Sequence, residues 1–378
     1  MRCTRRRVSL YLDGGPFLNG EKRRQPDQAG VFTRNPMRVA MYHNNRDIRV
    51  EEMPVPVAGP GEILMKVAAC GICGSDVMEW YRVKKAPLVL GHEVAGEIVQ
   101  VGNGVKGFRE GQRIAASHHV PCNTCRYCRR GHHTVCETLR TTNFFPGGLS
   151  EYLLLPALNV DRGVYPLPDE VSDDEATFIE PLACVLRGLR RTGMQPGDSV
   201  LVVGSGISGL LYVKLAACLG ASRIFATDVE ESRLSAAKQF GANAAFHAKD
   251  VHPDLLRKMN EGLLADIVIL CTGAKSAIMT ALACVERGGT VLVFAPTDDG
   301  VLVPLLVNSV FWRTDITLAT SYAGTPADHL TALELIRTKR LTVTDMITHR
   351  LPLSDTVKGF SLVSQGRESI KVIIAPHA

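Results

Sequence analysis

A glycine-rich turn in the middle of the chain limits the fold more than any other feature of the sequence. Residues 204–209 read Gly-Ser-Gly-Ile-Ser-Gly, directly after an apolar run and directly before a helical pattern that begins at Ile207. In this G-x-G-x-x-G sequence, Gly204 permits a tight turn, Gly206 lets the backbone approach a pyrophosphate, and Gly209 lets the helix pack closely on the strand. The pattern predicts a doubly wound α/β domain that binds a dinucleotide.

An acidic residue downstream supports the same interpretation and indicates which coenzyme binds. Asp228 lies 24 residues after Gly204, at the end of the next predicted strand, where its carboxylate can accept hydrogen bonds from ribose hydroxyls. Its negative charge would repel the 2′-phosphate of NADP, so we expect NAD. Arg233 complicates this expectation, because its guanidinium group could bind that phosphate if Asp228 pointed away.

The second half of the chain alternates apolar strands with helical stretches, which is typical of a parallel sheet covered by helices on both faces. The predicted strands are Ser199–Val203, Arg223–Thr227, Asp266–Cys271, Gly289–Phe294 and Ile316–Thr320. The predicted helices are Ile207–Leu219, Ser232–Phe240, Ala274–Arg287 and Ala327–Thr338. Residues 38–161 are instead rich in glycine, proline and short β-like runs, which predicts a separate β-rich domain.

The distribution of charge argues against two classes of partner. The 378 residues carry a net charge of +5, but residues 1–36 hold eight basic and three acidic side chains, leaving 35 of each sign in the remainder. A neutral folded part lacks the concentrated positive charge that nucleic acid or a membrane surface requires. No apolar stretch approaches the roughly 18 residues of a membrane-spanning helix. We expect residues 1–36 to form a disordered tail.

Four of the eleven cysteines crowd into fifteen positions, with the spacing C-x2-C-x2-C-x7-C; they are Cys122, Cys125, Cys128 and Cys136. Four thiolates at this spacing can enclose one tetrahedral ion. An iron–sulfur cluster is the alternative, but the bacterial ferredoxin pattern has a shorter last gap followed by proline, whereas Glu137 follows here. We therefore favour a structural Zn²⁺, because sulfur fills every coordination position. Because these cysteines have the spacing of metal ligands and do not form a disulfide framework, a reducing compartment is favoured. We expect the protein to be cytoplasmic.

Three further residues gain meaning from their settings, although each alone would be unremarkable. Cys73 stands in Gly-Ile-Cys-Gly-Ser-Asp, His92 in Gly-His-Glu and Glu180 in Glu-Pro-Leu, in that order ahead of the glycine-rich turn. With the four-cysteine segment, these settings resemble the zinc-dependent medium-chain dehydrogenases, and within them the sorbitol, other polyol and threonine dehydrogenases. The resemblance extends from about Met37 to the C-terminus.

The resemblance implies how the chain divides and assembles. A GroES-like catalytic domain would comprise residues 37–182 and 321–378, and a Rossmann dinucleotide-binding domain would comprise residues 183–320. Related enzymes form homodimers or homotetramers, so we expect one of these, with sheet extension through the apolar segment Val301–Val310 as the interface.

The resemblance also implies a catalytic zinc. Cys73 and His92 would be direct ligands, with Glu93 beside them and Glu180 at the position where alcohol dehydrogenases carry a second cysteine. Three protein ligands and one open position would let zinc lower the pKa of an alcohol oxygen, so that hydride can pass to the nicotinamide.

Neighbouring residues receive roles by the same resemblance. Ser75 resembles the hydroxyl that takes the substrate proton, and Asp76 resembles the carboxylate that accepts the other ring N–H of His92. Thr272 and Gly273 would line the coenzyme cleft. These roles describe a zinc-dependent oxidoreductase that transfers hydride between a secondary alcohol and NAD.

The sequence departs from sorbitol dehydrogenases at two places. They usually carry histidine and tyrosine just after the Ser-Asp pair, where this chain has Met78 and Glu79. They also carry an Arg-Tyr pair after the last sheet strand, where this chain has Ser321 and Tyr322. The substrate therefore stays open among polyols, cyclitols, simpler secondary alcohols and threonine-type amino alcohols. A metal-stabilised nucleotide-binding protein without catalysis is the alternative from a different class.

Two other sequence patterns are assigned no function. Cys70 and Cys73 form a C-x-x-C, but the βαβ context of a redox dithiol is absent. Two histidine pairs flank the cysteine segment and are interpreted as surface side chains; they are His118, His119, His132 and His133.

Overall fold

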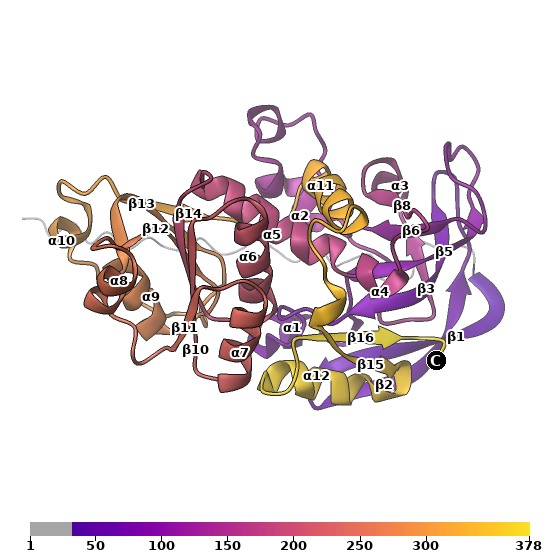
Figure 1. The fold of residues 1–378 in the computed structure, drawn as a ribbon. Helices are drawn as coiled ribbons and strands as arrows, with labels where there is room; N and C mark the ends of the chain where they lie inside the picture. The colour runs from indigo at the N-terminus through magenta and orange to yellow at the C-terminus, as the bar shows by residue number, and fades with distance from the viewer. Residues whose placement is uncertain (1–31) are drawn as a thin grey trace, which may run out of the picture.

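A computed structural model describes residues 32–378 and shows two halves that lie side by side, one β-rich and one built on a parallel sheet (Figure 1). Strand β1 (Phe32–Asn44) is the first described element, and residues 1–31 of the predicted tail lie outside the described residues. Residues 32–36 pair with β2 (Asp47–Pro56), so the folded part begins before the start predicted from the sequence.

The β-rich half contains a sheet in the order β15-β16-β3-β5-β6-β8, with β7 paired to β3, and a smaller sheet in the order β2-β1-β4. Apolar side chains including Tyr42, Met65 and Phe360 form the core of this half. The remaining strands are β3 (Ile63–Gly71), β4 (Leu88–Val89), β5 (Glu93–Val101), β6 (Arg113–Ala116), β7 (Tyr152–Leu155), β8 (Val164–Pro166), β15 (Ile347–Pro352) and β16 (Lys371–Ala375).

The other half contains a six-stranded sheet in the order β11-β10-β9-β12-β13-β14, in which every neighbouring pair is parallel. All five residues of β9 are buried, as expected for a central strand with helices on both faces. The strands are β9 (Ser199–Val203), β10 (Arg223–Asp228), β11 (Ala244–His247), β12 (Ala265–Leu270), β13 (Val285–Val293) and β14 (Thr317–Thr320).

The α/β fold class predicted from the sequence is confirmed, with two differences in the parallel sheet. Strand β11 was not predicted, because it is short and only half-buried. The predicted helix Ala274–Arg287 is too long, since α9 (Lys275–Ala283) ends early and Val285 already pairs with Ala265 of β12.

Helix α5 (Ile179–Thr192) lies at the junction of the two halves (Figure 1). It packs against α6 and α11, and its buried side chains share a cluster with Ala95 of β5 and Leu292 of β13. The boundary expected after residue 182 therefore falls inside this helix. The other helices of at least five residues are α2 (Glu137–Thr141), α3 (Ala157–Arg162), α6 (Ile207–Cys218), α7 (Glu231–Gln239), α8 (Pro253–Met259), α10 (Val307–Phe311), α11 (Pro326–Arg337) and α12 (Thr356–Gln365).

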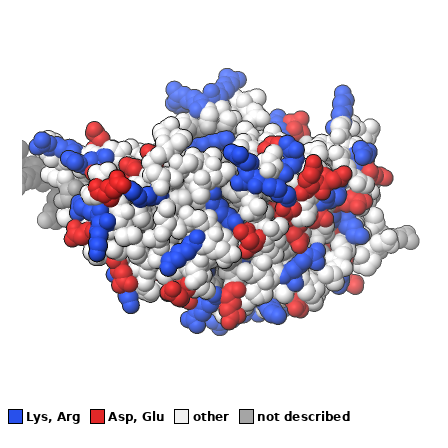
Figure 2. Space-filling model, viewed as in Figure 1, with Lys and Arg blue, Asp and Glu red and all other residues white. Residues whose placement is uncertain are grey.

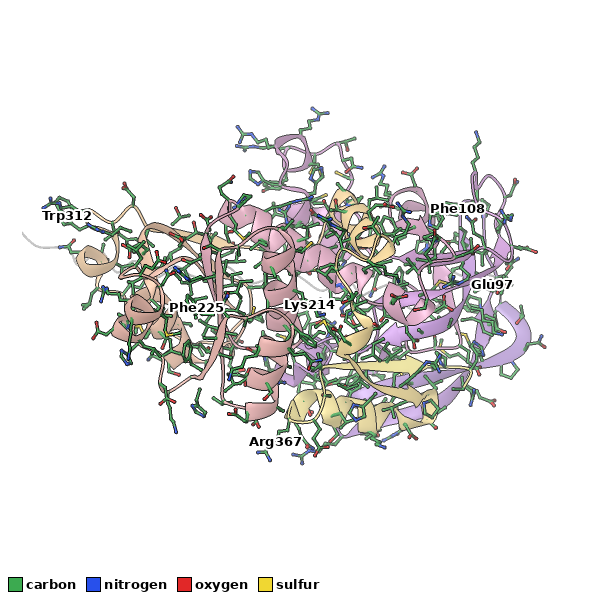
Figure 3. The ribbon with its side chains drawn as sticks, in the orientation of Figure 1. Glu97, Phe108, Lys214, Phe225, Trp312 and Arg367 are labelled. Atoms are coloured by element: carbon green, nitrogen blue, oxygen red, sulfur yellow. The ribbon has the colours of Figure 1, made fainter. Side chains whose placement is uncertain are left out.

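The surface carries charge of both signs without a large patch of one sign on the face in Figure 2. Phe225 lies within the half that contains the six-stranded parallel sheet, whereas Trp312 lies at the far end of that half and is 70% exposed (Figure 3). Among the helices of residues 32–378, none has the length and apolar character needed to cross a membrane.

Candidate active site

The glycine-rich turn lies at the carboxyl end of β9, where the strand order of the parallel sheet reverses between β10 and β12. Open sheets of this kind bind ligands in the crevice at that point. Gly204 has φ +95°, and a Cβ there would lie 3.2 Å from Thr272 Cβ. A Cβ on Gly209 would collide with the carbonyl oxygen of Gly204, and one on Gly273 would collide with Pro296. Close backbone packing therefore explains the glycines at these positions.

Asp228 ends β10 and is 7% exposed. Its Oδ2 accepts a hydrogen bond from the backbone N–H of Ser205 at 2.7 Å. Its Oδ1 accepts from the backbone N–H groups of Val229 at 2.8 Å and Glu230 at 3.0 Å. The carboxylate thus fixes the glycine-rich turn against β10, and its remaining lone pairs stay available to a ribose.

Arg233 of α7 lies beside this carboxylate, with Nη1 3.7 Å from Asp228 Oδ2. A Cβ on Gly206 would lie 3.8 Å from the same nitrogen. A Cβ on Gly366, which follows α12, would collide with the guanidinium group. Arg233 is therefore held between the glycine-rich turn and the β-rich half instead of extending freely into the crevice.

The four clustered cysteines bring their sulfur atoms together at one point. The Sγ–Sγ distances are 3.6 Å for Cys125–Cys128, 3.6 Å for Cys136–Cys122 and 3.9 Å for Cys122–Cys128. A tetrahedron with zinc–sulfur bonds of about 2.3 Å has edges of about 3.8 Å, so the donor set fits zinc. Among residues 32–378, only Leu139 and Ala323 join these cysteines in the apolar cluster of this lobe.

A second group of ligand atoms forms where β3 and β5 pair. Gly71 at the end of β3 is opposite Glu93 at the start of β5, which brings the residues beyond both strand ends together. The ligand atoms of Cys73, His92 and Glu93 lie within 4.8 Å of one another. One thiolate, one imidazole and one carboxylate are donors that suit a catalytic zinc with an open position.

Buried charges surround His92. Its Nδ1 lies 3.4 Å from Asp76 Oδ1, and Asp76 is completely buried. Burial works in the opposite direction, but the charges of Asp76 and Cys73 raise the pKa of His92 well above its usual range. Because Nδ1 faces Asp76, Nε2 is the ring nitrogen that remains available to a metal.

Arg82 connects Asp76 with Ser75. Its Nη2 donates to Ser75 Oγ at 3.0 Å and lies 3.3 Å from Asp76 Oδ1, while its Nε donates to the Ser75 carbonyl at 2.9 Å. The Ser75 oxygen accepts from Arg82, so its own hydrogen and its second lone pair remain free. Arg82 was not predicted, because a basic residue in a one-turn helix gives no signal of its partners.

Lys371 of β16 is the buried partner of Glu93. Its ammonium group forms an ion pair with that carboxylate and lies 5.0 Å from the ring centroid of Phe178. A Cβ on Gly71 would collide with the ends of both charged side chains, so the ion pair would have to shift to make room for one. The sequence does carry a signal for Lys371, since it is a single charge within an otherwise apolar strand.

Glu180, expected at the metal, lies outside the group of three. It is in the first turn of α5, and Cys184 one turn later donates to its Oε1 at 3.4 Å. Burial raises the pKa of Glu180, and Glu93 adds to this, whereas His92 opposes it. Glu180 therefore borders the site without completing the ligand group.

The interpretation of His118 and His119 as surface side chains is wrong. The His118 ring lies 4.7 Å from the His92 ring, and the rings of His118 and His119 stack at 3.7 Å. His119 in turn hydrogen-bonds Tyr322 at 3.1 Å. His132, in contrast, is exposed.

Comparison with known proteins assigns the family. The family model described as "Alcohol dehydrogenase GroES-like domain" matches residues 59–169, and the one described as "Zinc-binding dehydrogenase" matches residues 208–338. Together with the fold and the two groups of metal-binding side chains, these matches define a class of enzyme. The chain belongs to the zinc-dependent medium-chain dehydrogenases, which confirms the resemblance inferred from its motifs.

Within that family the chain is similar to polyol enzymes. It is 33% identical to sorbitol dehydrogenase of Gallus gallus over 346 residues, which cover 88% of this chain and 95% of that protein. It is 32% identical to the protein named Probable D-xylulose reductase A of Neosartorya fischeri over 342 residues, 87% of this chain and 93% of that protein.

Solved structures agree on the fold. The alcohol dehydrogenase TADH of Thermus sp. ATN1 has a TM-score of 0.79 and 29% identity, covering 90% of this chain and 99% of that one. A zinc-binding dehydrogenase of Sinorhizobium meliloti 1021, bound to NADP, has a TM-score of 0.80 and 26% identity, covering 91% and 100%.

Proposed function

We propose that this oxidoreductase oxidises a polyol or cyclitol at a secondary carbinol and transfers the hydride to NAD. The observation that carries the proposal is the group formed by Cys73, His92 and Glu93, whose ligand atoms lie within 4.8 Å. The similarity to sorbitol dehydrogenase supports the substrate class. Zinc bound by this group would supply a Lewis acid that lowers the pKa of the substrate alcohol.

The surrounding residues support a division of tasks. Asp76 holds the His92 ring in the orientation that directs Nε2 to the metal. Ser75 accepts the substrate proton at Oγ, with Arg82 fixing the position of that oxygen. Glu180 acts through its charge, which interacts with His92 and Glu93. Lys371 compensates the charge of Glu93.

NAD is proposed over NADP because Asp228 ends β10, where a carboxylate would accept hydrogen bonds from ribose hydroxyls and would repel a 2′-phosphate. Its charge is fixed by three backbone N–H donors, and Arg233 is held against Gly366, so neither side chain is free to move aside. Like charges a few Å apart in a partly desolvated crevice cost a few kcal/mol, on the order of a hundredfold in preference. Asp228→Ala should shift the preference toward NADP, and equal efficiency of the wild type with both coenzymes would contradict the assignment.

The substrate class is tested by NAD-linked oxidation of sorbitol, xylitol, a cyclitol, threonine and butan-2-ol by the zinc-loaded protein. Turnover of a polyol, lost in Cys73→Ser with the fold retained, supports the proposal. Preference for threonine would favour an amino alcohol dehydrogenase. Coenzyme binding without turnover of any alcohol would favour a non-catalytic nucleotide-binding protein.

A homodimer is proposed from the far end of the nucleotide-binding half. Residues 301–310, which were expected to extend the sheet, do not form a strand, and helix α10 begins within them. Strand β14 is the edge strand at this end of the sheet. Within residues 301–310, Leu302 is 83% exposed and Leu306 is 76% exposed, an apolar surface suited to a second copy. Leu306→Glu should increase the monomer fraction in sedimentation, and an unchanged assembly would contradict this interface.

A reducing compartment such as the cytoplasm is also proposed. All ten cysteines among residues 32–378 are unpaired thiols; four of them form one candidate metal site, and Cys73 belongs to the other. Thiolates can bind zinc only while they stay reduced. Fractionation of cells that express the full chain would test this, and recovery from an oxidising compartment would contradict it.

A further inference from the structure

The His92 ring is only partly fixed by its contact with Asp76. Its Nδ1 lies 3.4 Å from Asp76 Oδ1, which is long for a hydrogen bond. This contact sets the direction of the ring, but the ring can still tilt about the line that joins the two atoms. A tilt would displace Nε2, the nitrogen that remains available to a metal. Because neighbours that orient a metal ligand affect metal affinity, the second contact of this ring matters.

His118 provides that second contact. The ring centroids of His92 and His118 lie 4.7 Å apart, and the ring planes are tilted by 43°. Within residues 32–378, neither ring nitrogen of His118 has a hydrogen-bond partner. His118 therefore meets His92 with the body of its ring and not through a hydrogen bond. In this position it blocks a tilt of the His92 ring toward it.

His118 is itself enclosed on two further sides. The His119 ring stacks on it, with centroids 3.7 Å apart and planes 30° apart. Phe144, which is 5% exposed, meets it edge-on with centroids 6.1 Å apart. Protein interiors are packed as closely as organic crystals, so a ring enclosed in this way cannot shift without displacing its neighbours. The contact with His92 is therefore a firm one.

Hydrogen bonds hold the segment that carries both histidines. The Nδ1 of His119 faces the carbonyl oxygen of Thr142 at 3.1 Å, and a carbonyl only accepts, so Nδ1 donates. Thr142 Oγ1 accepts from the backbone N–H of Val120 at 3.0 Å. The buried side chain of Asn159 donates to the carbonyl oxygen of His118 at 3.0 Å. The rings thus have a defined position before any metal binds, which favours affinity.

The two rings bring no positive charge to the metal-binding group. Burial lowers the pKa of His118 well below its usual range, and the positive charges of His119, His92 and Arg82 add to this effect. Burial also lowers the pKa of His119 to about 4, although the hydrogen bond to Thr142 opposes it. Both rings are therefore neutral at neutral pH, and neither repels a cation held by His92.

We propose that His118 is a positioning residue for His92 and that the flat shape of its ring sets the metal affinity of the group formed by Cys73, His92 and Glu93. This inference rests on the proposed function, since it takes that group to bind zinc. The role belongs to the shape of the ring and not to its nitrogen atoms. Another aromatic ring should therefore replace His118, whereas a side chain of similar bulk that is not flat should not.

The test compares two replacements of His118. His118→Phe keeps a flat ring, and His118→Leu keeps apolar bulk without one. Competition with a chromophoric chelator measures zinc affinity in each variant. In His118→Leu we expect the group that contains His92 to bind zinc about 10–100-fold more weakly, the usual cost of losing a residue that orients a metal ligand. In His118→Phe the affinity should stay close to that of the wild type, and the four-cysteine group should be unaffected in both.

A spectroscopic measurement separates positioning from a general loss of stability. Co²⁺ in place of zinc has visible absorption bands that depend on the directions of its ligands. The spectrum of Cys73→Ser, which keeps only the four-cysteine group, is subtracted from that of each protein. We expect shifted bands in His118→Leu and wild-type bands in His118→Phe.

Two further variants complete the comparison. His119→Leu should shift the cobalt bands less than His118→Leu does, because it loosens the His118 ring without removing it. His252→Leu replaces an exposed histidine that precedes α8 in the other half of the molecule. This matched control should change neither zinc affinity nor the cobalt spectrum.

The possible results distinguish failure of this inference from failure of the proposed function. Wild-type affinity and bands in His118→Leu would overturn the inference, and so would a His118→Phe variant as weak as His118→Leu. If His118→Leu did not fold, unchanged affinity and bands in His119→Leu would overturn it instead. The measurements need no alcohol, so they stand even if no substrate is turned over. Absence of zinc from this group in the wild type would contradict the proposed function itself.

Discussion

Lys371 and Glu93 form a buried ion pair across 278 residues of sequence, and Glu93 belongs to the candidate zinc group. The two side chains are 1% and 2% exposed. Because desolvation of both charges is costly, a pair of this kind persists only while each charge has its partner. The relationship links the C-terminal strand of the chain to its proposed catalytic centre.

In the zinc-free protein, Lys371→Met should therefore lower the free energy of unfolding by about 3–5 kcal/mol, since it leaves the Glu93 carboxylate buried without a counter-charge. Urea denaturation measures this directly. The double variant Lys371→Met/Glu93→Gln should recover part of the loss, whereas Lys258→Met on the exposed face of α8 should have no effect. If Lys371→Met unfolded with the wild-type free energy, the pair would not be formed.

The two groups of metal-binding side chains should have separable effects on metal content. We expect two zinc ions per chain by elemental analysis, one in each group. Cys125→Ser should remove one zinc and lower Tm by several degrees, because the lobe has almost no apolar core of its own. Cys73→Ser should remove one zinc and abolish turnover, with a smaller change in Tm.

Cys218→Ser is the matched control for both cysteine variants. Cys218 is half-buried at the end of α6 and lies outside both groups, so its replacement should change neither metal content nor turnover. A single zinc in the wild type, or iron in place of zinc, would contradict the assignment.

The parallel sheet was predictable because its strands are short apolar runs separated by helical periods and glycine turns. Strand β9 has the bounds predicted from the sequence. Strand β11 was missed because each of its four residues is only half-buried, which weakens the apolar signal. The boundary between the two halves could not be predicted either, because α5 packs on both halves and nothing in its sequence indicates this.

Site residues that stand in local sequence motifs could be predicted, whereas site residues that only the topology brings together could not. Cys73 and His92 stand in distinctive local sequences, so they could be chosen in advance. The neighbours His118 and Arg82 come close to them only through strand register and loop path, which leave no local pattern. Lys371 is visible as the single charge of its strand, but nothing local indicates that its partner is Glu93. For the same reason the sequence could not separate Glu180 from the ligand group.

A chain that begins at Met37 should be less stable than one that begins at Phe32. The shorter chain loses the pairs Phe32–Pro56 and Pro36–Pro54 between β1 and β2, and the Phe32 ring contact with Phe145 at 6.2 Å. We expect the free energy of unfolding to fall by about 1 kcal/mol, the contribution of one aromatic pair with its strand contacts. Thermal denaturation of the two chains measures the difference, and identical Tm values would show that residues 32–36 contribute nothing.

Glu175 should make stability depend on pH in the acidic range. Burial alone would raise its pKa, but an ion pair with Lys339 at 2.7 Å and hydrogen bonds from Ser172 hold it below the ordinary value of 4.5. A carboxylate whose pKa is lower in the folded state than in the unfolded state stabilises the fold at pH values above its unfolded-state pKa. This stabilisation is lost as pH falls through the folded-state pKa. Glu175→Gln should therefore cost about 1 kcal/mol at pH 7, a cost that shrinks as pH falls below the ordinary pKa of 4.5 and through the lower folded-state pKa. Urea denaturation at a series of pH values measures this, with Asp169→Asn as an exposed control that should follow the wild type. A cost that stayed constant or grew toward low pH would mean that the carboxylate is not held by these partners.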